Sequence, residues 1–149
     1  MKHMFVATIW AFMFPTIFSF HIEDCGSEVG NFTHVTISSC KGTDPVCVLK
    51  KNSNVTLDIY FTTSVTDNSV TAAVHGIIQG LPVPWPLHDP NACHLSGLTC
   101  PLQLGNNYHY TTIISVLKTY PKISLEVKWE LKNENGKDIV CALIPAKIM

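Results

Sequence analysis

Apolar and polar residues alternate along several stretches of the chain. Residues 55–62 alternate Val, Leu, Ile and Phe with Thr, Asp and Tyr, and residues 123–132 alternate Ile, Leu, Val and Trp with Ser, Glu and Lys. A period of two is typical of strands with one face buried and the other face in water. The sequence Asn-Glu-Asn-Gly at residues 133–136 indicates a turn, and residues 139–144 predict a further strand after it.

Weaker alternation predicts strands at residues 29–37, 70–78 and 108–117. No long stretch has the 3.6-residue period of an amphipathic helix. About seven strands joined by short turns indicate an immunoglobulin-like antiparallel β-sandwich. The chain has no internal repeat, low-complexity tract or linker, so we expect one domain.

Residues 80–87 read Gly-Leu-Pro-Val-Pro-Trp-Pro-Leu, with a proline at every second position. Prolines 82, 84 and 86 lack an amide donor, so this segment cannot be a central strand, and the prolines stiffen it in an extended form. In an extended segment the apolar residues between them point to one side: Leu81, Val83, Trp85 and Leu87. These side chains either cover the sandwich edge and fill the core or form the wall of an apolar cavity, and the pattern alone slightly favours the first interpretation.

The first residues have the pattern of a secretory signal peptide. A short basic start is followed by an apolar run over residues 4–18 and by the small residue Ser19. This run is shorter than the roughly 20 residues that a helix needs to cross a bilayer, and Pro15 weakens a helix there. We therefore predict a signal peptide at residues 1–19, a mature domain at residues 20–149 and export from the cell.

Six cysteines in an exported chain of this length indicate a disulfide framework. They fall into two close pairs and one wide pair: Cys40 and Cys47, Cys93 and Cys100, and Cys25 and Cys141. Many pairings are compatible with the sequence, and a nested arrangement is the simplest because short loops cost the least chain entropy to close. No Cys-x-x-Cys pair occurs, so zinc-binding and thioredoxin-like sites have little support.

The surface chemistry suits an exported protein better than a nucleic-acid-binding one. The formal net charge is −1, and all ten basic residues are lysine. Nucleic-acid-binding proteins usually have a basic surplus and contact their partner through arginine, so we expect no nucleic-acid partner. Two Asn-x-Thr triplets, at Asn31 and Asn54, predict N-linked glycans.

The sequence contains none of the short motifs that mark nucleophilic, zinc-dependent, phosphate-binding or calcium-binding sites. His88, His94 and His109 lack the spacing of metal ligands and are interpreted as surface residues, and His75 lies in an apolar run as a structural histidine. We therefore expect no enzyme activity, catalytic residue, metal or cofactor. Ligand binding is the function class that remains. Disulfides that each add about 2–4 kcal/mol to the stability of the folded state would offset the packing lost around a cavity.

Several short motifs, taken together and in order, resemble one known family. They lie at residues 24–27, 74–77, 82–86, 100–101, 120–121, 127–131 and 144–145. Over essentially the whole mature chain, this set resembles the Niemann–Pick type C second-protein branch of the lipid-recognition (ML) domain family. Arthropod members are the most similar type.

The resemblance implies a sandwich with an apolar cavity between its sheets and the nested disulfides Cys25–Cys141, Cys40–Cys47 and Cys93–Cys100. It places Trp85, Val116 and Tyr120 at the cavity mouth. It also implies contributions to the wall from Val83, Ile78, Ile114, Pro121 and Trp129. Sterol carriers commonly have Phe where this chain has Trp85, and the larger ring would narrow or reshape the entrance.

The resemblance implies a secreted, monomeric carrier of hydrophobic small molecules such as fatty acids, sterols or lipid-like semiochemicals. One alternative is a sterol-transfer protein of intracellular cholesterol transport, which acts in the acidic lysosomal lumen and hands its ligand to a membrane receptor. A second alternative is an interaction module that presents lipid to a protein receptor.

Overall fold

The computed structural model describes residue 11, residues 21–40 and residues 44–149. The predicted signal peptide at residues 1–19 lies outside the described residues, apart from residue 11. The strands of the described part are β1 (Glu23–Asp24), β2 (Gly30–Ile37), β3 (Cys47–Leu49), β4 (Ser53–Thr63), β5 (Thr71–Ile78), β6 (Leu81–Pro84), β7 (Asn107–Val116), β8 (Ser124–Lys132) and β9 (Asp138–Ile148). Within that part, we find no helix of the length and hydropathy needed to cross a membrane.

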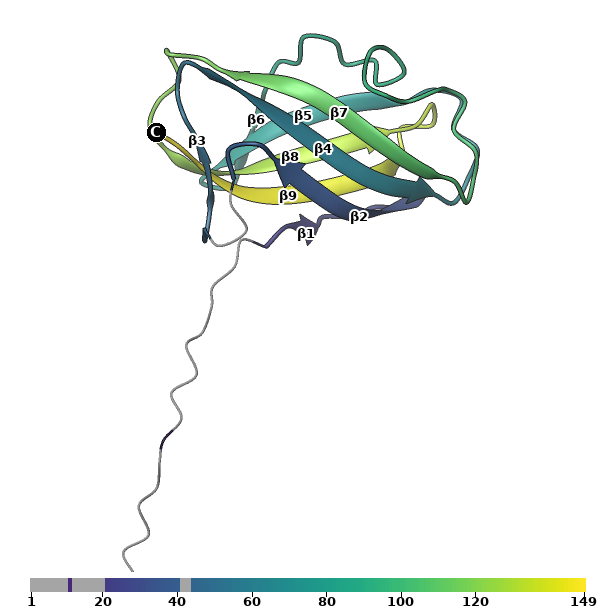
Figure 1. The fold of residues 1–149 in the computed structure, drawn as a ribbon, viewed down its shortest axis with the longest axis horizontal. Coiled ribbons are helices and arrows are strands. Elements are labelled where there is room, and N and C mark those ends of the chain that lie inside the picture. The colour runs from purple at the N-terminus through teal and green to yellow at the C-terminus, as the bar shows by residue number, and fades with distance from the viewer. Residues whose placement is uncertain (1–10, 12–20, 41–43) are drawn as a thin grey trace, which may run out of the picture.

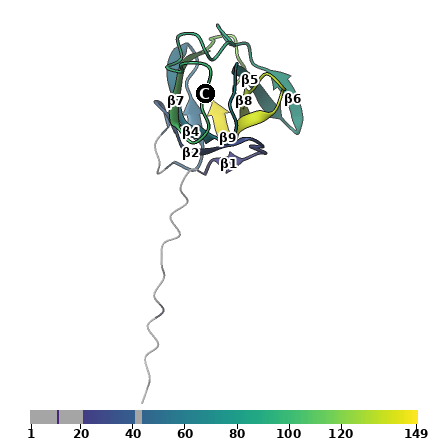
Figure 2. The ribbon, with the colours of Figure 1, turned by 90° about the vertical axis from the view of Figure 1, so that its right-hand side faces the viewer.

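The strands form two sheets that face each other (Figures 1 and 2). The larger sheet has the strand order β1-β9-β8-β5-β6, and β3 also pairs with β9; the smaller sheet has the order β2-β4-β7. Apolar side chains from both sheets meet between them to form the core. The predicted all-β sandwich is therefore confirmed.

The long strands coincide with the segments in which apolar and polar residues alternate. Strand β4 shows the expected burial most clearly, because its inward side chains are at most 3% exposed: Val55, Leu57, Ile59 and Phe61. Strand β8 follows the same rule, with Leu125, Val127, Trp129 and Leu131 buried. Its outward residue Glu130 is also buried, which the alternation did not predict.

Strand β9 is longer than the predicted segment 139–144. Residues 139–142 are all fully buried and lack the alternation of a half-exposed strand, whereas the buried residues alternate with more exposed ones over residues 143–148. One edge of β9 pairs with β8, while the other edge pairs antiparallel with β1 and then parallel with β3. The parallel pair was not predicted, because a strand of three residues is too short to show a periodic pattern.

The proline segment forms the edge strand β6, as its missing amide donors require. The two-residue turn Gln79-Gly80 between β5 and β6 has positive φ at both positions, 50° and 79°. This is the type I′ geometry that matches the twist of a hairpin. Leu81 and Val83 are 68% and 46% exposed, so the interpretation that these side chains fill the core is wrong for them.

The end of the sandwich near the β8–β9 turn is closed by buried hydrogen bonds. The Thr63 hydroxyl donates to Oδ2 of Asp67 at 2.6 Å, and the Asn133 amide donates to Oδ1 of Asp67 at 3.1 Å. The Asp67 backbone pairs in both directions with Leu102. These bonds satisfy a fully buried carboxyl group and tie three loops together.

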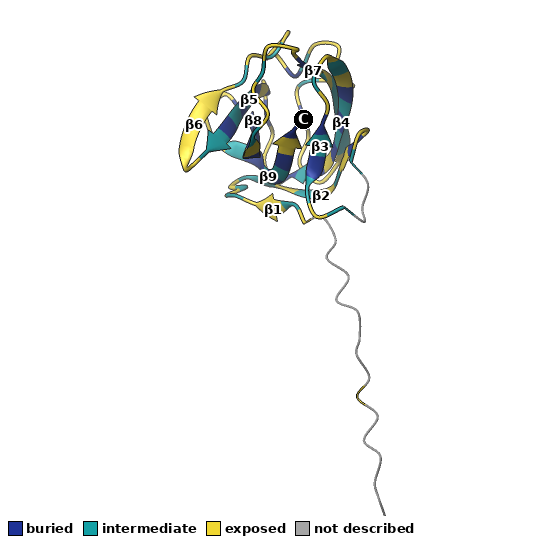
Figure 3. Ribbon diagram, turned by 90° about the vertical axis from the view of Figure 1, so that its left-hand side faces the viewer, coloured by how far each residue is buried: buried dark blue, intermediate teal, exposed yellow. Residues whose placement is uncertain are grey.

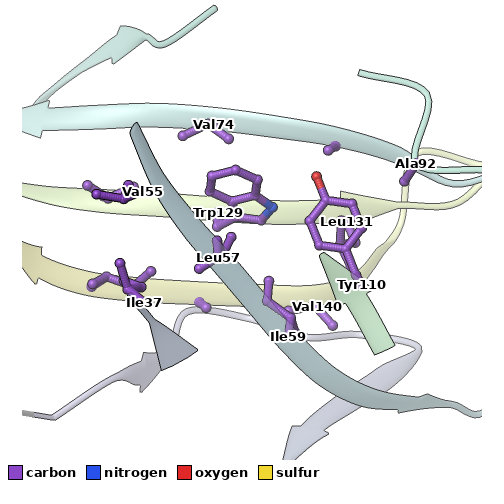
Figure 4. Packing of buried hydrophobic residues seen from close by; sticks show 14 of the residues in the cluster. Ile37, Val55, Leu57, Ile59, Val74, Ala92, Tyr110, Trp129, Leu131 and Val140 are labelled. Carbon is purple, nitrogen blue, oxygen red and sulfur yellow. The ribbon is translucent and has the colours of Figure 1, made fainter. Parts of the chain in front are cut away.

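All six cysteines are paired as the resemblance implied: Cys25–Cys141, Cys40–Cys47 and Cys93–Cys100. Trp129 lies in the middle of the core, between Leu57 and Tyr110 (Figure 4). Its ring centroid lies 6.1 Å from that of Tyr110, with the rings tilted by 57°.

Candidate ligand-binding site

A cavity lies between the two sheets at the end opposite the Asp67 hydrogen bonds. Figure 3 views the molecule from this end, with β3 and the C-terminus toward the viewer. The cavity is lined by apolar side chains and by one disulfide sulfur: Ile37, Cys47, Leu49, Val55, Leu57, Val74, Trp85, Ile114, Val116, Val127, Trp129, Ile144 and Ala146. This inner cavity has a volume of about 20 Å³.

An open groove of about 160 Å³ lies beside the inner cavity. It is formed by β5, β6, the loop before β8 and the ends of β8 and β9: Gly76, Ile78, Val83, Pro84, Trp85, Pro86, Tyr120, Pro121, Ile123, Leu125 and Ile148. Trp85 lines both hollows, so its ring separates the interior from the surface. Gly76 keeps the groove floor low, since a Cβ atom there would lie 3.0 Å from Leu125 Cδ1.

Trp85 and Tyr120 form an aromatic pair at the mouth. Their ring centroids are 5.4 Å apart and the rings meet edge to face at 82°, an arrangement favoured by the aromatic quadrupole. The Trp85 amide donates to the Val74 carbonyl at 2.8 Å, which anchors its backbone to β5 just beyond the end of β6. The Tyr120 amide donates to the Leu117 carbonyl at 3.1 Å and closes the turn after β7.

The rim of the mouth is apolar and exposed. A second surface hollow, of about 300 Å³, lies on the other side of Tyr120 and is lined by Ile113, Ile114, Leu117 and four other residues. Ile113 and Leu117 are 65% and 48% exposed. Together with the exposed Val83 of β6, which lines the groove, they place apolar side chains along both sides of the entrance.

The inner cavity is too small for a lipid in this conformation. Pockets that enclose small molecules usually have volumes of about 300–1,000 Å³, whereas this one holds little more than a water molecule. A ligand therefore has to displace part of the wall. Trp129 is fully buried and locked in the core, while Trp85 is only partly buried at a sheet edge. Trp85 and Ile114 are the lining residues that are only partly buried, and Trp85 lies beyond the end of its strand, so we expect its ring to move most readily.

The structure places all eight residues that the sequence singled out around these two hollows. Ile114, Val116 and Trp129 line the inner cavity, and Trp85 lines both hollows. Val116, which was predicted at the mouth, is therefore inside and buried. Tyr120 lies in the open groove, together with three residues that were predicted in the wall: Ile78, Val83 and Pro121. That these residues contact a ligand remains a prediction.

Sequence reasoning missed much of the wall. Val55 and Leu57 of β4 and Val127 of β8 line the cavity from strands whose alternation already showed which side chains face inward. The signal that could have identified these residues is that their side chains face the same interior as Trp129. Cys47 and Leu49 of β3 gave no such signal, since that strand was not predicted.

Among the residues that the structure describes, those lining the inner cavity carry no ionisable side chain apart from Cys47, which is in a disulfide. Deeper in the core, burial raises the pKa of the Tyr110 hydroxyl to about 12, so this group stays neutral at physiological pH. An apolar, uncharged interior suits the burial of hydrocarbon and gives no group for acid–base or nucleophilic chemistry.

Of the three histidines considered as metal ligands, His88 lines the surface hollow beside Tyr120. His94 and His109 line neither this hollow, the groove nor the inner cavity, and they contact different carboxylates. His94 Nδ1 is 3.6 Å from Asp89 Oδ2, and His109 Nε2 is 2.6 Å from Asp58 Oδ1. Within the described ranges, one group of three potential ligands converges, namely Glu130, Asp138 and Cys141. Cys141 is in a disulfide and offers no thiolate, so this group is a poor fit to a metal.

The two glycosylation triplets lie on the small sheet. Asn31 is exposed on β2 and Asn54 is exposed on β4. The Asn54 side chain accepts a hydrogen bond from Ser115 at 3.0 Å. Both asparagines are thus accessible to the modification that the sequence predicts.

Known proteins resemble this chain in sequence and in structure. The model of the ML domain family matches residues 19–148. NPC intracellular cholesterol transporter 2 homolog a of Drosophila melanogaster is 46% identical over 126 residues, which cover 85% of each chain. The ecdysteroid-regulated 16 kDa protein of Manduca sexta is 47% identical over 125 residues, which cover 84% of this chain and 86% of that protein.

The solved structure of a Niemann–Pick type C2 protein from the Japanese carpenter ant superposes with a TM-score of 0.84 at 39% identity. The match covers 87% of this chain and all of the ant chain. Two sheets, three nested disulfides and an apolar hollow between the sheets accompany this similarity. The chain therefore belongs to the ML-domain family, as a Niemann–Pick type C2-like member of this non-enzymatic, lipid- and sterol-binding family.

Proposed function

We propose that the protein is a secreted carrier that encloses one hydrophobic molecule between its two sheets. The observation that supports this most strongly is the position of Trp85, which separates an apolar interior from an open apolar groove. In the proposed mechanism, a ligand first lies in the groove, the Trp85 ring turns aside, and the apolar part of the ligand enters between the sheets.

The free energy of binding would come from burial of hydrocarbon. Each CH₂ group removed from water contributes about 0.8 kcal/mol, so a long chain gains affinity without polar contacts. Part of this gain is spent in parting close-packed walls. A polar head group would stay at the mouth beside the Tyr120 ring, where water can solvate it.

The small resting cavity favours a slender, flexible ligand over a rigid one. A single acyl chain displaces less of the wall than a fused ring system, and packed cores resist displacement. We therefore propose long-chain fatty acids or semiochemicals with similar chains as the preferred class, and sterols as the second.

Displacement of a fluorescent fatty acid would test the ligand class. The oxidised mature protein is loaded with the probe and titrated with oleate and, separately, with cholesterol. We expect both to displace the probe, with oleate effective at lower concentration. Displacement by cholesterol at much lower concentration would reverse the proposed preference, and failure of the protein to take up the probe would count against a carrier.

The alternative is sterol transfer in the acidic lysosomal lumen. The printed name of the fruit-fly relative, an intracellular cholesterol transporter, supports this candidate. It differs from a free carrier by requiring delivery to an acceptor membrane or a membrane receptor. Transfer of cholesterol from the protein to vesicles, measured at acidic and neutral pH, separates the two functions.

A further inference from the structure

A pair of carboxyl groups lies on the outer face of the large sheet, far from the ligand site. Glu130 of β8 is directly opposite Cys141 of β9, and Asp138 is the first residue of β9. One carboxyl oxygen of Glu130, one of Asp138 and the sulfur of Cys141 all lie within 4.8 Å of one another. Only 7% of the Glu130 side chain is exposed, so the two acids meet where water is largely excluded.

The neighbouring cations are arranged around one member of this pair. Lys128 Nζ lies 3.7 Å from one Glu130 oxygen, and Lys132 Nζ lies 3.4 Å from the other. Both lysines are two residues from Glu130, which puts all three side chains on the same face of β8. Among the described residues, no lysine ammonium forms an ion pair with Asp138.

Asp138 is left with an unsatisfied oxygen. Its Oδ1 is buried and has no hydrogen-bond partner within the described ranges. A buried carboxylate oxygen without a donor is costly, and a like charge within a few ångströms adds repulsion. A proton on Asp138, donated to the Glu130 carboxylate, removes both problems at once.

The pair lies at a seam between the N-terminal segment and the large sheet. The amides of Glu28 and Val29 both donate to the Asp138 carbonyl, at 2.8 and 3.0 Å. The Cys25–Cys141 disulfide joins the same two segments. Because of this position, ionisation of Asp138 can affect how firmly residues 25–29 are held against the large sheet.

We propose that Asp138 and Glu130 form a proton-sharing pair that holds this seam more firmly at acidic than at neutral pH. Below neutrality, protonated Asp138 bridges to Glu130, which keeps its charge and its two lysines. As the pH rises, Asp138 ionises, the two carboxylates repel, and the seam weakens. The seam is thus more stable at acidic pH through a device separate from the ligand site.

The titration of the two acids supports this geometry. Burial, followed by the hydrogen bond and charge of Glu130, raises the pKa of Asp138 from 3.8 to about 7. Burial opposes ionisation of Glu130, but the hydrogen bond with Asp138 and the charges of Lys128 and Lys132 hold its pKa below its usual value. Between about pH 4.5 and 7, Asp138 is therefore the member of the pair that titrates.

The sign of the pH effect follows from linkage. Between pH 3.8 and about 7 the folded state keeps a proton on Asp138 that the unfolded chain has lost. The stability contributed by this group is complete at low pH and is lost as the pH rises through about 7. A difference of one bound proton lets the unfolding equilibrium constant rise by at most about tenfold for each pH unit in this range. The partial exposure of Asp138 reduces the effect.

Other charged groups on the surrounding elements also contribute to the electrostatic potential at Asp138. They are Glu23 and Asp24 on β1, Glu28 before β2, His75 on β5 opposite Lys128, and Glu134 and Lys137 in the β8–β9 turn. Because their effects are common to wild type and variant, a comparison of the two isolates Asp138.

The test is the pH dependence of unfolding for the wild type and Asp138→Asn, measured with denaturant between about pH 5 and 8. The amide cannot ionise but can still donate to Glu130. We expect the wild type to lose stability relative to the variant as pH rises, by up to about tenfold in unfolding constant per pH unit. Glu126→Gln is a matched control on the same face of β8, and we expect its curve to run parallel to the wild type.

Parallel curves for the wild type and Asp138→Asn would overturn the proposal. A second measurement needs no variant: the ¹³C shift of the Asp138 side-chain carboxyl, followed by NMR during a pH titration of the folded wild type. A midpoint near 7 supports the shared proton. A midpoint near 4, the value of an ordinary aspartate, overturns it even if the variant fails to fold.

Discussion

At the scale of single residues, we propose that Trp85 controls access to the interior. It is half-buried at the end of an edge strand, lines both hollows and meets Tyr120 edge to face. Trp129 has the same chemistry but is fully enclosed. The two tryptophans therefore have different roles: Trp129 supports the core, and Trp85 covers the entrance.

Replacing the mouth aromatics should weaken binding and spare the fold. We expect Trp85→Ala and Tyr120→Ala each to raise the Kd for a fatty acid about tenfold, or roughly 1.4 kcal/mol, through lost apolar and aromatic contact. Trp85→Phe should retain most of the affinity. Probe titrations give Kd, and denaturation midpoints monitor the fold.

The matched control for these variants is Leu104→Ala, an apolar truncation at an exposed position away from both hollows. We expect its affinity to equal that of the wild type. Unchanged affinity in well-folded Trp85→Ala and Tyr120→Ala would show that the mouth has been assigned to the wrong residues.

At the scale of elements, β6 shows why the prolines occupy alternate positions. The Trp85 amide points toward β5, where it donates to Val74. Positions 82 and 84 are out of phase with Trp85, so their nitrogens point to the free edge of the sheet. Prolines there leave that edge without amide donors and prevent another strand from pairing with it.

Restoring those donors should promote association. We expect the double variant Pro82→Thr, Pro84→Thr to self-associate at concentrations where the wild type does not, because β6 then offers a regular edge beside exposed Leu81 and Val83. Light scattering coupled to size exclusion measures the mass of each. A wild-type elution profile for the double variant would contradict this role of the prolines.

The elements also show what the sequence could and could not predict. Strands β4 and β8 were predictable because each has one buried and one wet face, which imposes a period of two. Strand β3 was not, because a three-residue strand has no period. The first part of β9 was harder to recognise for a different reason, since residues 139–142 are all buried and show no alternation. The buried Glu130 was also missed, because its burial depends on Cys141 and Asp138, which lie on the next strand.

At the scale of the whole molecule, we propose that the sandwich is a container, closed at one end and covered at the other by an aromatic pair that moves aside. Hydrogen bonds around Asp67 close one end, and the Trp85–Tyr120 pair covers the other. The mouth residues were identified from family resemblance, since no alternation pattern distinguishes a cavity wall from ordinary core. The small volume of the resting cavity emerged only from the structure.

The central claim is that this container holds an apolar ligand, and native mass spectrometry of the secreted, oxidised protein tests it most directly. Bound molecules are then extracted and identified. We expect one fatty acid or related chain per protein in the wild type and a lower occupancy in Trp85→Ala. A protein that is empty when isolated and does not take up added fatty acid or sterol would contradict the account.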